Sequence, residues 1–264
     1  MITPQLVGEL LQQVRAQSPL VHNITNFVVM NNTANALLSA GASPVMAHAP
    51  EEMEAMAGIA SALVLNIGTL SRQWVEGMLI AGKTARKRKI PIVLDPVGAG
   101  ATTFRTETCH QLIRECHPTV IRGNASEIMA LISSDIRTKG VDSTESSDEA
   151  LQMAKTLARE TQAVISISGK TDYITDGTQV ICIRNHIPLM PKVTGMGCTA
   201  SALTGAFAAV SNDALTGAAA AMAIMAVAGE KAASAAKGPG SFQMHFLDAL
   251  YTLNQDDINQ NLKL

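Results

Sequence analysis

The sequence is poor in aromatic residues and carries little net charge. Aromatic residues make up only 3% of its 264 residues, and the formal net charge is −2 at pH 7. A near-neutral chain gives no electrostatic reason to bind nucleic acid or an anionic membrane surface, so we expect neither partner. Since 47% of the residues are hydrophobic, the chain can bury a large core, which Ala, Met and Gly must fill in place of rings.

Cysteines are few and widely spaced. The four are Cys109, Cys116, Cys182 and Cys198, and no two of them form a CxxC pair. This pattern excludes a disulfide-rich scaffold and favours a reduced protein of the cytoplasm. The N-terminal stretch "MITPQLVGELLQQ" contains Glu9 and no basic leader, so we do not expect a secretory signal.

Long hydrophobic runs are also lacking. The most apolar stretch, "ALTGAAAAMAIMAVAG" (214–229), is rich in alanine and is followed at once by Glu230 and Lys231. It is shorter than a full membrane span, so we expect a buried core helix.

The chain alternates short β-branched runs with longer helical patterns. Six runs predict strands: "PLVHNI", "ASPVMA", "ALVLNIG", "PIVLDPV", "TVIRGN" and "AVISIS". Apolar strands separated by helices indicate a parallel sheet that is buried on both faces. After Ser168, "TDYITDGTQVICIR" predicts a hairpin around Asp176-Gly177, and the chain from Gly197 onward is almost wholly helical. The sequence therefore predicts one α/β domain over residues 1–264. Its most polar segment, 133–150, is expected to be an exposed loop leading into a helix.

Polar residues gather where the predicted strands end. "PIVLD" ends in Asp95, "TVIRGN" contains Arg122, and "AVISIS" ends in Ser168, while Glu127 falls in the first turn of a helix that begins near Asn124. Ligands of open parallel sheets bind beyond these carboxyl ends. Each residue alone has a structural explanation, such as a capping box for Asn124 and Glu127. Together they predict a site for Mg²⁺, held by carboxylates, and for a polyphosphate, bound by the arginine.

Two further motifs could suggest other sites. "SGKT" (168–171) resembles the end of a P-loop, but Val164 stands where that motif needs glycine, and a hairpin follows instead of a helix. "CHQLIRECH" (109–117) repeats Cys-His at helical spacing, for which helix packing is favoured over a metal site. His48, His186 and His245 are expected to be structural or surface residues.

"VTGMGCTAS" (193–201) opens a helical pattern with two glycines. Gly195 and Gly197 can bring the backbone close to a ligand, and the free N–H groups of the helix N-terminus form an anion site. Such a site suits a transferring phosphoryl group. The helix dipole would lower the pKa of Cys198, which could then accept a proton from a hydroxyl group. Packing of Cys198 against the phosphate site is the alternative, and both roles stay open.

Eight segments in a fixed order resemble the hydroxyethylthiazole kinases of the ribokinase-like superfamily. They are "SPLVHNITNFVV", "ASPVMAHAPEE", "NIGTL", "LDPVGAGAT", "IRGNASEIMAL", "KGVDS", "VTGMGCTASAL" and "GPGSFQMHFLDAL". The resemblance covers nearly the whole chain. It implies a three-layer αβα sandwich and ATP-dependent phosphorylation of 4-methyl-5-(2-hydroxyethyl)thiazole in thiamine synthesis or salvage. It also implies Mg²⁺ and a homotrimer whose thiazole sites form between subunits.

The resemblance assigns roles by position. Met46, Gly195, Asn23 and Thr25 would contact the thiazole, and Arg122 and Ser168 would bind ATP. Asp95 and Glu127 would organise Mg²⁺ on the ATP side, and the amides after Gly195, with Gly197 and Cys198, would form the catalytic anion hole. A nucleotide-repair lyase of the same fold and a non-catalytic nucleotide sensor are the competing hypotheses. The "HNITN" segment argues against the lyase, and Asp95 with Glu127 argues against the sensor.

Overall fold

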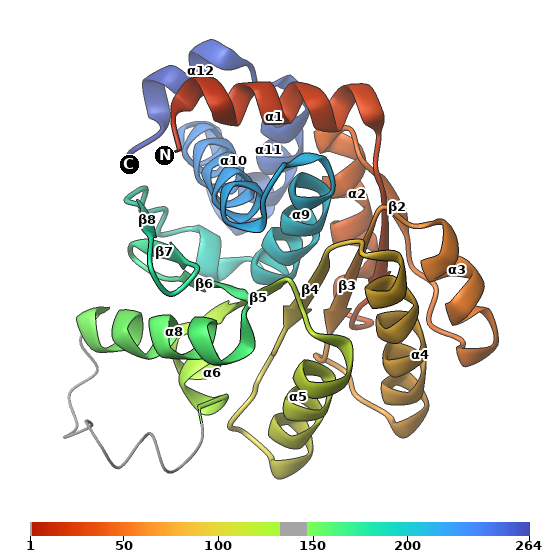
Figure 1. Ribbon diagram of the computed structural model, residues 1–264. Coiled ribbons are helices and arrows are strands. Elements are labelled where there is room, and N and C mark those ends of the chain that lie inside the picture. The colour runs from red at the N-terminus through yellow and green to blue at the C-terminus, as the bar shows by residue number, and fades with distance from the viewer. Residues whose placement is uncertain (1, 133–146) are drawn as a thin grey trace.

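The computed structural model describes residues 2–132 and 147–264. Most of the segment 133–150, predicted above to be an exposed loop, lies outside the described residues. The strands are β1 (Leu20–Ile24), β2 (Ser43–Val45), β3 (Ala62–Asn66), β4 (Ile92–Asp95), β5 (Val120–Asn124), β6 (Val164–Ser168), β7 (Asp172–Thr175) and β8 (Val180–Ile183). They form a sheet of order β2-β1-β3-β4-β5-β6-β7-β8 (Figure 1).

The sheet is mainly parallel, as predicted. The first six strands in this order, β2, β1, β3, β4, β5 and β6, run parallel. Strands β7 and β8 add an antiparallel hairpin at one edge. The hairpin turn contains Gly177 at φ 94°, where the Asp-Gly signal predicted it. Strand β2 forms the opposite edge.

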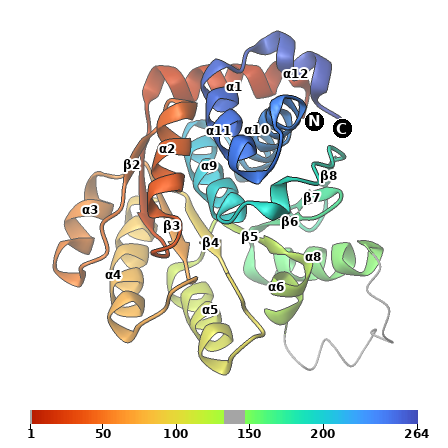
Figure 2. The same cartoon turned by 180° about the vertical axis from the view of Figure 1, so that it is seen from behind.

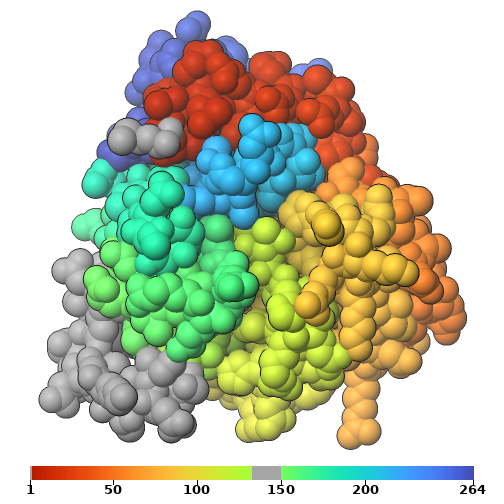
Figure 3. Space-filling view, viewed as in Figure 1, coloured from red at the N-terminus to blue at the C-terminus, as the bar shows by residue number. Residues whose placement is uncertain are grey.

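Helices cover both faces of the sheet (Figures 1 and 2). One layer holds α1 (Pro4–Gln17), α2 (Met30–Ala40), α9 (Met196–Val210), α10 (Ala214–Ala235), α11 (Pro239–Thr252) and α12 (Gln255–Asn261). The other holds α3 (Met53–Ile59), α4 (Arg72–Arg88), α5 (Thr103–Cys116), α6 (Ala125–Ala130) and α8 (Ser147–Thr161). Two short 3₁₀ turns are η1 (Pro50–Glu52) and η2 (Met190–Lys192). Helices α1, α4, α5 and α8 form much of the surface in the space-filling view (Figure 3).

The strands alternate their side chains between the two layers. Val64 and Val93 point into the α9–α10 side of the core, whereas their neighbours Leu65 and Leu94 pack against the α4–α5 side. This period of two places one apolar residue on each face in turn, so both faces are buried. The predicted three-layer αβα arrangement is therefore confirmed.

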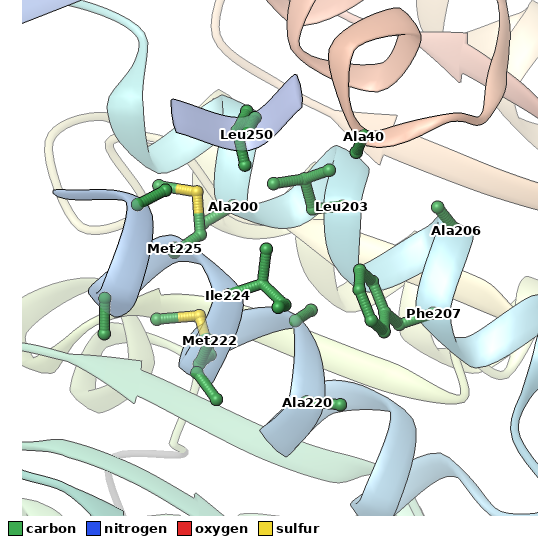
Figure 4. Close-up of a cluster of buried hydrophobic side chains, with 14 of the residues drawn as sticks. Ala40, Ala200, Leu203, Ala206, Phe207, Ala220, Met222, Ile224, Met225 and Leu250 are labelled. Atoms are coloured by element: carbon green, nitrogen blue, oxygen red, sulfur yellow. The ribbon is translucent and has the colours of Figure 1, made fainter. Parts of the chain in front are cut away.

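Helix α10 is the centre of the larger core layer. Figure 4 shows Met222, Ile224 and Met225 from α10 meeting Leu203 and Phe207 from α9. Among the described residues α10 alone is long and apolar enough to cross a membrane, but 72% of its most apolar window is buried within the protein. The predicted buried core helix is confirmed.

Local signals fix several helix ends. Helix α6 begins with a capping box in which the Asn124 side chain accepts from the Glu127 N–H at 2.9 Å. Helix α4 ends with the basic residues 86–88 in its last turn, where positive charge favours the C-terminal end of the helix dipole. The "SGKT" segment forms the turn between β6 and β7, which agrees with the rejection of a P-loop.

Candidate active site

The carboxyl ends of four neighbouring strands meet at one edge of the sheet. Asn66 at the end of β3 pairs in register with Asp95 at the end of β4. Asn124 at the end of β5 pairs with Ser168 at the end of β6. The parallel register alone therefore brings these polar residues side by side, which is where ligands of such sheets bind.

A cavity of about 510 Å³ lies over this edge. Its walls come from the ends of β4, β5 and β6, the N-terminus of α9, the segment between β8 and α9, and α10. The lining includes the predicted residues Asp95, Arg122, Glu127, Ser168, Gly195, Gly197 and Cys198. The structure thus brings together the residues expected at the polyphosphate end of the site.

The N-terminus of α9 faces the cavity beside an arginine. Gly195 is the N-cap residue and has φ 85°, a left-handed conformation that glycine adopts without strain. A Cβ atom added at Gly197 would lie 2.8 Å from Nη1 of Arg122. Only glycine therefore lets the guanidinium approach the helix end this closely. The free N–H groups of the first turn and the arginine together offer hydrogen-bond donors and positive charge to an anion.

Arg122 is held in place but retains an unused donor. Its Nη2 donates to Oγ of Ser168 at 2.6 Å, and the residue is only 7% exposed. Its buried Nε–H has no partner among the described residues. A buried guanidinium with a donor to spare is suited to bind an anion such as a phosphate in the adjoining cavity.

The Asp95 carboxylate is buried and held by two donors. Asn66 Nδ2 donates to its Oδ2 at 2.7 Å, and Ser201 Oγ does so at 2.8 Å. Burial raises the pKa of Asp95 to about 6, although the positive charge of Arg122 and the hydrogen bond from Ser201 act in the opposite direction. Asp95 is therefore largely ionised at pH 7 and places a negative charge at the end of β4.

The two carboxylates fit a magnesium ion that keeps several of its waters. Among the described residues, the donors that reach the Asp95 side chain both bind Oδ2, which leaves Oδ1 available. Glu127 accepts one backbone N–H on each oxygen, from Gly98 and from Asn124 at 2.9 Å, and each oxygen keeps a second lone pair. The described residues hold no cluster of three or more His, Cys, Asp or Glu side chains. Mg²⁺ commonly binds through one or two carboxylates, waters and substrate phosphates, so this donor set suits it.

The predicted lowering of the Cys198 pKa is wrong. Burial, together with the nearby charge of Asp95, raises the pKa of the Cys198 thiol to about 11. These effects outweigh the hydrogen bonds and the charge of Arg122 that lower the pKa, so the thiol stays protonated at neutral pH. Its Sγ accepts hydrogen bonds from Nδ2 of Asn66 at 3.2 Å and of Asn26 at 3.4 Å. A neutral thiol is a poor base, which favours the packing role, and a catalytic role of Cys198 stays a prediction.

Three predicted substrate residues do not line this cavity within one chain. Asn23 and Thr25 are buried, and Asn23 uses Nδ2 to bind the Val21 carbonyl at 2.9 Å. Met46 follows the edge strand β2 and is half-buried. Their contact with a thiazole stays a prediction. Of the "NITN" turn, it is Asn26 that reaches the site, through Asn66 and Cys198.

Sequence patterns missed several residues of the site. Asn66 joins three elements, because its Oδ1 accepts from Asn26 while its Nδ2 donates to Asp95 and Cys198. His186, which was expected to be a structural or surface residue, lines the cavity. The position of Asn66 at the end of a buried strand could have signalled its role. His186 lies outside any strand end, so no sequence pattern pointed to it.

The predicted Cys-His metal alternative is not supported. Cys109 and Cys116 are fully buried in the core between α4, α5 and the sheet. Burial raises the pKa of each thiol to about 12, which opposes the thiolate form that binds metals. Packing is their role.

Comparisons with known proteins agree on one family. The model of the hydroxyethylthiazole kinase family matches residues 11–256. A hydroxyethylthiazole kinase of Oleidesulfovibrio alaskensis is 55% identical over 258 residues, which cover 98% of this chain and 97% of that protein.

Solved structures extend the agreement to three dimensions. The structure of the hydroxyethylthiazole kinase protein from Pyrococcus horikoshii OT3 has a TM-score of 0.91 at 44% identity and covers 98% of each chain. An ADP complex of Bacillus subtilis pyridoxal kinase has a TM-score of 0.60 at 18% identity, covering 80% of this chain and 91% of that chain. This second likeness shows the ribokinase-like fold alone.

Proposed function

Because the chain belongs to the hydroxyethylthiazole kinase family, we propose that it transfers a phosphoryl group from ATP to the hydroxyl of 4-methyl-5-(2-hydroxyethyl)thiazole. The product is the phosphate ester used in thiamine synthesis or salvage. The observation that carries the proposal is the anion site of α9 and Arg122, which faces the same cavity as Asp95 and Glu127. A cationic pocket beside two carboxylates is what a metal-bound triphosphate requires.

Arg122 and Ser168 bind the phosphates of ATP in this proposal. The Arg122 guanidinium and the N–H groups that follow Gly195 would offer positive charge to the transferring group, since both line the same cavity. Phosphoryl transfer builds negative charge on the equatorial oxygens, and fixed donors that need no reorganisation stabilise it. The chain therefore acts mainly by positioning and electrostatics, with Gly195, Gly197 and Cys198 at the catalytic helix end.

Asp95 and Glu127 would hold Mg²⁺ and its waters. When bound, the cation neutralises charge on the phosphates and fixes their orientation. The hydrogen bonds from Asn66 and Ser201 keep the Asp95 carboxylate turned toward the cavity. The N–H groups of Gly98 and Asn124 do the same for Glu127.

The apolar half of the cavity suits the nucleobase. It is lined by Ile187, Met190, Met222 and Met225, whose flexible side chains adapt to a flat ring. Arg122 and the α9 N-terminus lie on the other wall of the same cavity, next to where the phosphates would lie. The base and the triphosphate thus fit into one continuous space.

The thiazole site is proposed to form between subunits of a homotrimer. Met46 lies beyond the edge strand β2, outside the cavity of its own chain. Phe27 and Val28 next to the "NITN" turn are 64% and 63% exposed, an apolar surface that a second subunit would cover. Met46, Asn23 and Thr25 would then contact the ring together with Gly195. We place the enzyme in the cytoplasm, where its small-molecule substrates occur, with no nucleic acid or membrane as partner.

One assay tests the proposed reaction. The purified protein is incubated with Mg-ATP and the thiazole alcohol, and the phosphate ester is sought by mass spectrometry. Hydroxymethylpyrimidine serves as a comparison substrate and is expected to give little or no product. Absence of the thiazole ester, with the protein folded, would overturn the proposal.

A magnesium titration tests the two carboxylates. Asp95→Asn and Glu127→Gln should each raise the Mg²⁺ concentration needed for half-maximal turnover, because each removes a negative charge that attracts the cation. Asp213→Asn, which changes a distant helix cap at α10, is the matched control. An unchanged titration in Asp95→Asn would remove that residue from the metal site.

A further inference from the structure

The cavity wall that follows β8 is tied to the C-terminal segment. The N–H of Arg184 donates to the carbonyl of Lys263 at 2.8 Å. The Asn185 side chain makes two more bonds, since Nδ2 donates to the Asn261 carbonyl at 2.7 Å and Oδ1 accepts from the Lys263 N–H at 3.0 Å. Both ribbon views place the C-terminus beside β8 (Figures 1 and 2). We call residues 261–263 the C-terminal clamp.

The orientation of the Asn185 amide is fixed by its partners. A backbone N–H can only donate and a carbonyl can only accept, so the side chain cannot be flipped without losing both bonds. The residue is only 5% exposed, and an unpaired amide at this depth would be costly. Both polar atoms of the Asn185 side chain are therefore engaged with the clamp.

Asn185 and the two residues after it form part of the cavity wall. Asn185, His186 and Ile187 all line the cavity, as do Met222 and Met225 of α10. Ile187 also packs on α10, where its Cγ1 lies 3.3 Å from the position of a Cβ at Gly229. Contacts with the clamp and with α10 thus fix the position of residues 185–187 in the cavity wall.

We propose that the C-terminal clamp is a positioning element for ATP binding. The clamp acts through Asn185 to hold His186 and Ile187 against the nucleotide. The inference rests on the proposed function, because that function assigns this half of the cavity to the nucleobase. It goes further in naming residues 261–263, which are not part of the cavity lining, as determinants of nucleotide affinity. The clamp should leave the thiazole side unaffected.

Other contacts hold the end of the chain independently of Asn185. Lys263 Nζ pairs with Glu230, and Lys231 pairs with Asp257 of α12 at 2.6 Å. Loss of the Asn185 bonds therefore need not release the whole segment, which makes a selective test possible.

The test compares two substitutions at one position. Lys263→Pro removes the backbone N–H that donates to Asn185 Oδ1, and it also removes the ion pair between Lys263 and Glu230. Lys263→Ala removes only the ion pair. Leu262 has φ −73° and ψ 127°, a conformation that tolerates a following proline. The difference between the two variants isolates the hydrogen bond to Asn185.

Asn185→Ala provides a second test in case the proline variant fails to fold. It removes both side-chain hydrogen bonds to the clamp and adds no charge to the cavity that Asn185 lines. Folding is checked by circular dichroism and thermal unfolding. ATP affinity is measured by calorimetry, and KM for ATP, KM for the thiazole alcohol and kcat are measured separately.

Lys263→Pro should weaken ATP binding about tenfold, as expected for the loss of one buried hydrogen bond, and Asn185→Ala should weaken it at least as much because it removes two. The KM for the thiazole and kcat should change less than about twofold, and Lys263→Ala should match the wild type throughout. Equal ATP affinity in Lys263→Pro and Lys263→Ala, or a parallel rise in both KM values, would overturn the clamp. If the wild type itself neither binds ATP nor forms the ester, the proposed function fails instead, whatever the variants do.

Discussion

At the scale of single residues, Cys198 illustrates how a buried neighbour can define a site without reacting. Its thiol, with a pKa of about 11, is protonated at pH 7 and accepts hydrogen bonds from two asparagine amides. A neutral sulfur in this position cannot remove a proton efficiently from an alcohol. The anion site around it consists of backbone N–H groups and Arg122, which do not depend on the sulfur.

Cys198→Ala should therefore lose less than about tenfold in kcat, well below the roughly 10²–10⁴-fold that a general base supplies. Cys198→Asp should keep or raise turnover, because a carboxylate would accept from the same two amides and provide a base beside the hydroxyl group. Steady-state kinetics at saturating substrates measure both. Cys182→Ala on strand β8 is the matched cysteine control. A thousandfold loss in folded Cys198→Ala, or a folded but inactive Cys198→Asp, would contradict this account.

Asp95 shows the stability cost of an active-site charge. Burial raises its pKa from 3.8 to about 6 in the folded protein. The folded state therefore binds this proton more tightly than the unfolded state between these pH values. The contribution of Asp95 to the free energy of unfolding is therefore most favourable below pH 4, where the carboxyl is protonated. This contribution is lost as the pH rises to 6, so the full destabilisation by the buried charge is present above pH 7.

Asp95→Asn should thus stabilise the metal-free and nucleotide-free protein at pH 8 by about 1–3 kcal/mol, since one pKa unit corresponds to 1.36 kcal/mol. The gain should shrink as the pH falls through 6 toward 4. Thermal unfolding at pH 8 and pH 5 measures it, while turnover in the same variant should fall. A stability gain that does not depend on pH would show that the charge of Asp95 is not its source.

At the scale of secondary structure elements, the site depends on how closely α9 approaches the end of β5. Gly197 is the contact point, because its missing side chain leaves room for the Arg122 guanidinium. The glycine pair is thus needed for two different reasons: conformation at Gly195 and space at Gly197. Either reason can be tested by adding one methyl group.

Gly197→Ala should raise KM for ATP roughly tenfold to a hundredfold and lower kcat, because the new Cβ displaces Arg122 from the helix end. The guanidinium is the flexible end of a side chain, so the variant should still fold. Gly240→Ala in α11, where the added Cβ meets nothing within 4 Å, is the control for a general effect of the substitution. Wild-type kinetics in Gly197→Ala would show that this close approach does not matter for ATP.

Elements also explain what could be predicted from the sequence. Six strands and the hairpin follow from short apolar runs and Asp176-Gly177, because burial on both faces leaves a strong local pattern. Asp95, Arg122 and Ser168 could be placed together because parallel strands end at one edge. The raised pKa of Cys198 could not be predicted, since it depends on burial and on Asp95, which is distant in sequence. His186 was missed for a related reason: its place in the wall comes from a loop held by the C-terminal clamp.

At the scale of the whole molecule, the proposed trimer leaves each chain with only part of the site. The proposed ligands of ATP and Mg²⁺ line the cavity of one chain, whereas Met46 follows the edge strand β2 and is not part of that lining. The exposed Phe27 and Val28 adjoin the turn that leads to Asn26, and thus to the amide network around Cys198. A subunit seated on this surface would bring the two halves of the site together.

The final prediction follows from that arrangement. Light scattering should give the mass of three chains for the wild type. Phe27→Glu should lower this mass and raise KM for the thiazole at least about tenfold, because it would bury a charge in the subunit interface. ATP affinity by calorimetry should change little, since Phe27 is not part of the cavity lining. Phe104→Glu, at an exposed aromatic residue of α5, should leave mass and KM unchanged. A monomeric wild type that retains full turnover would exclude shared sites, because every residue that contacts the thiazole would then have to come from one chain.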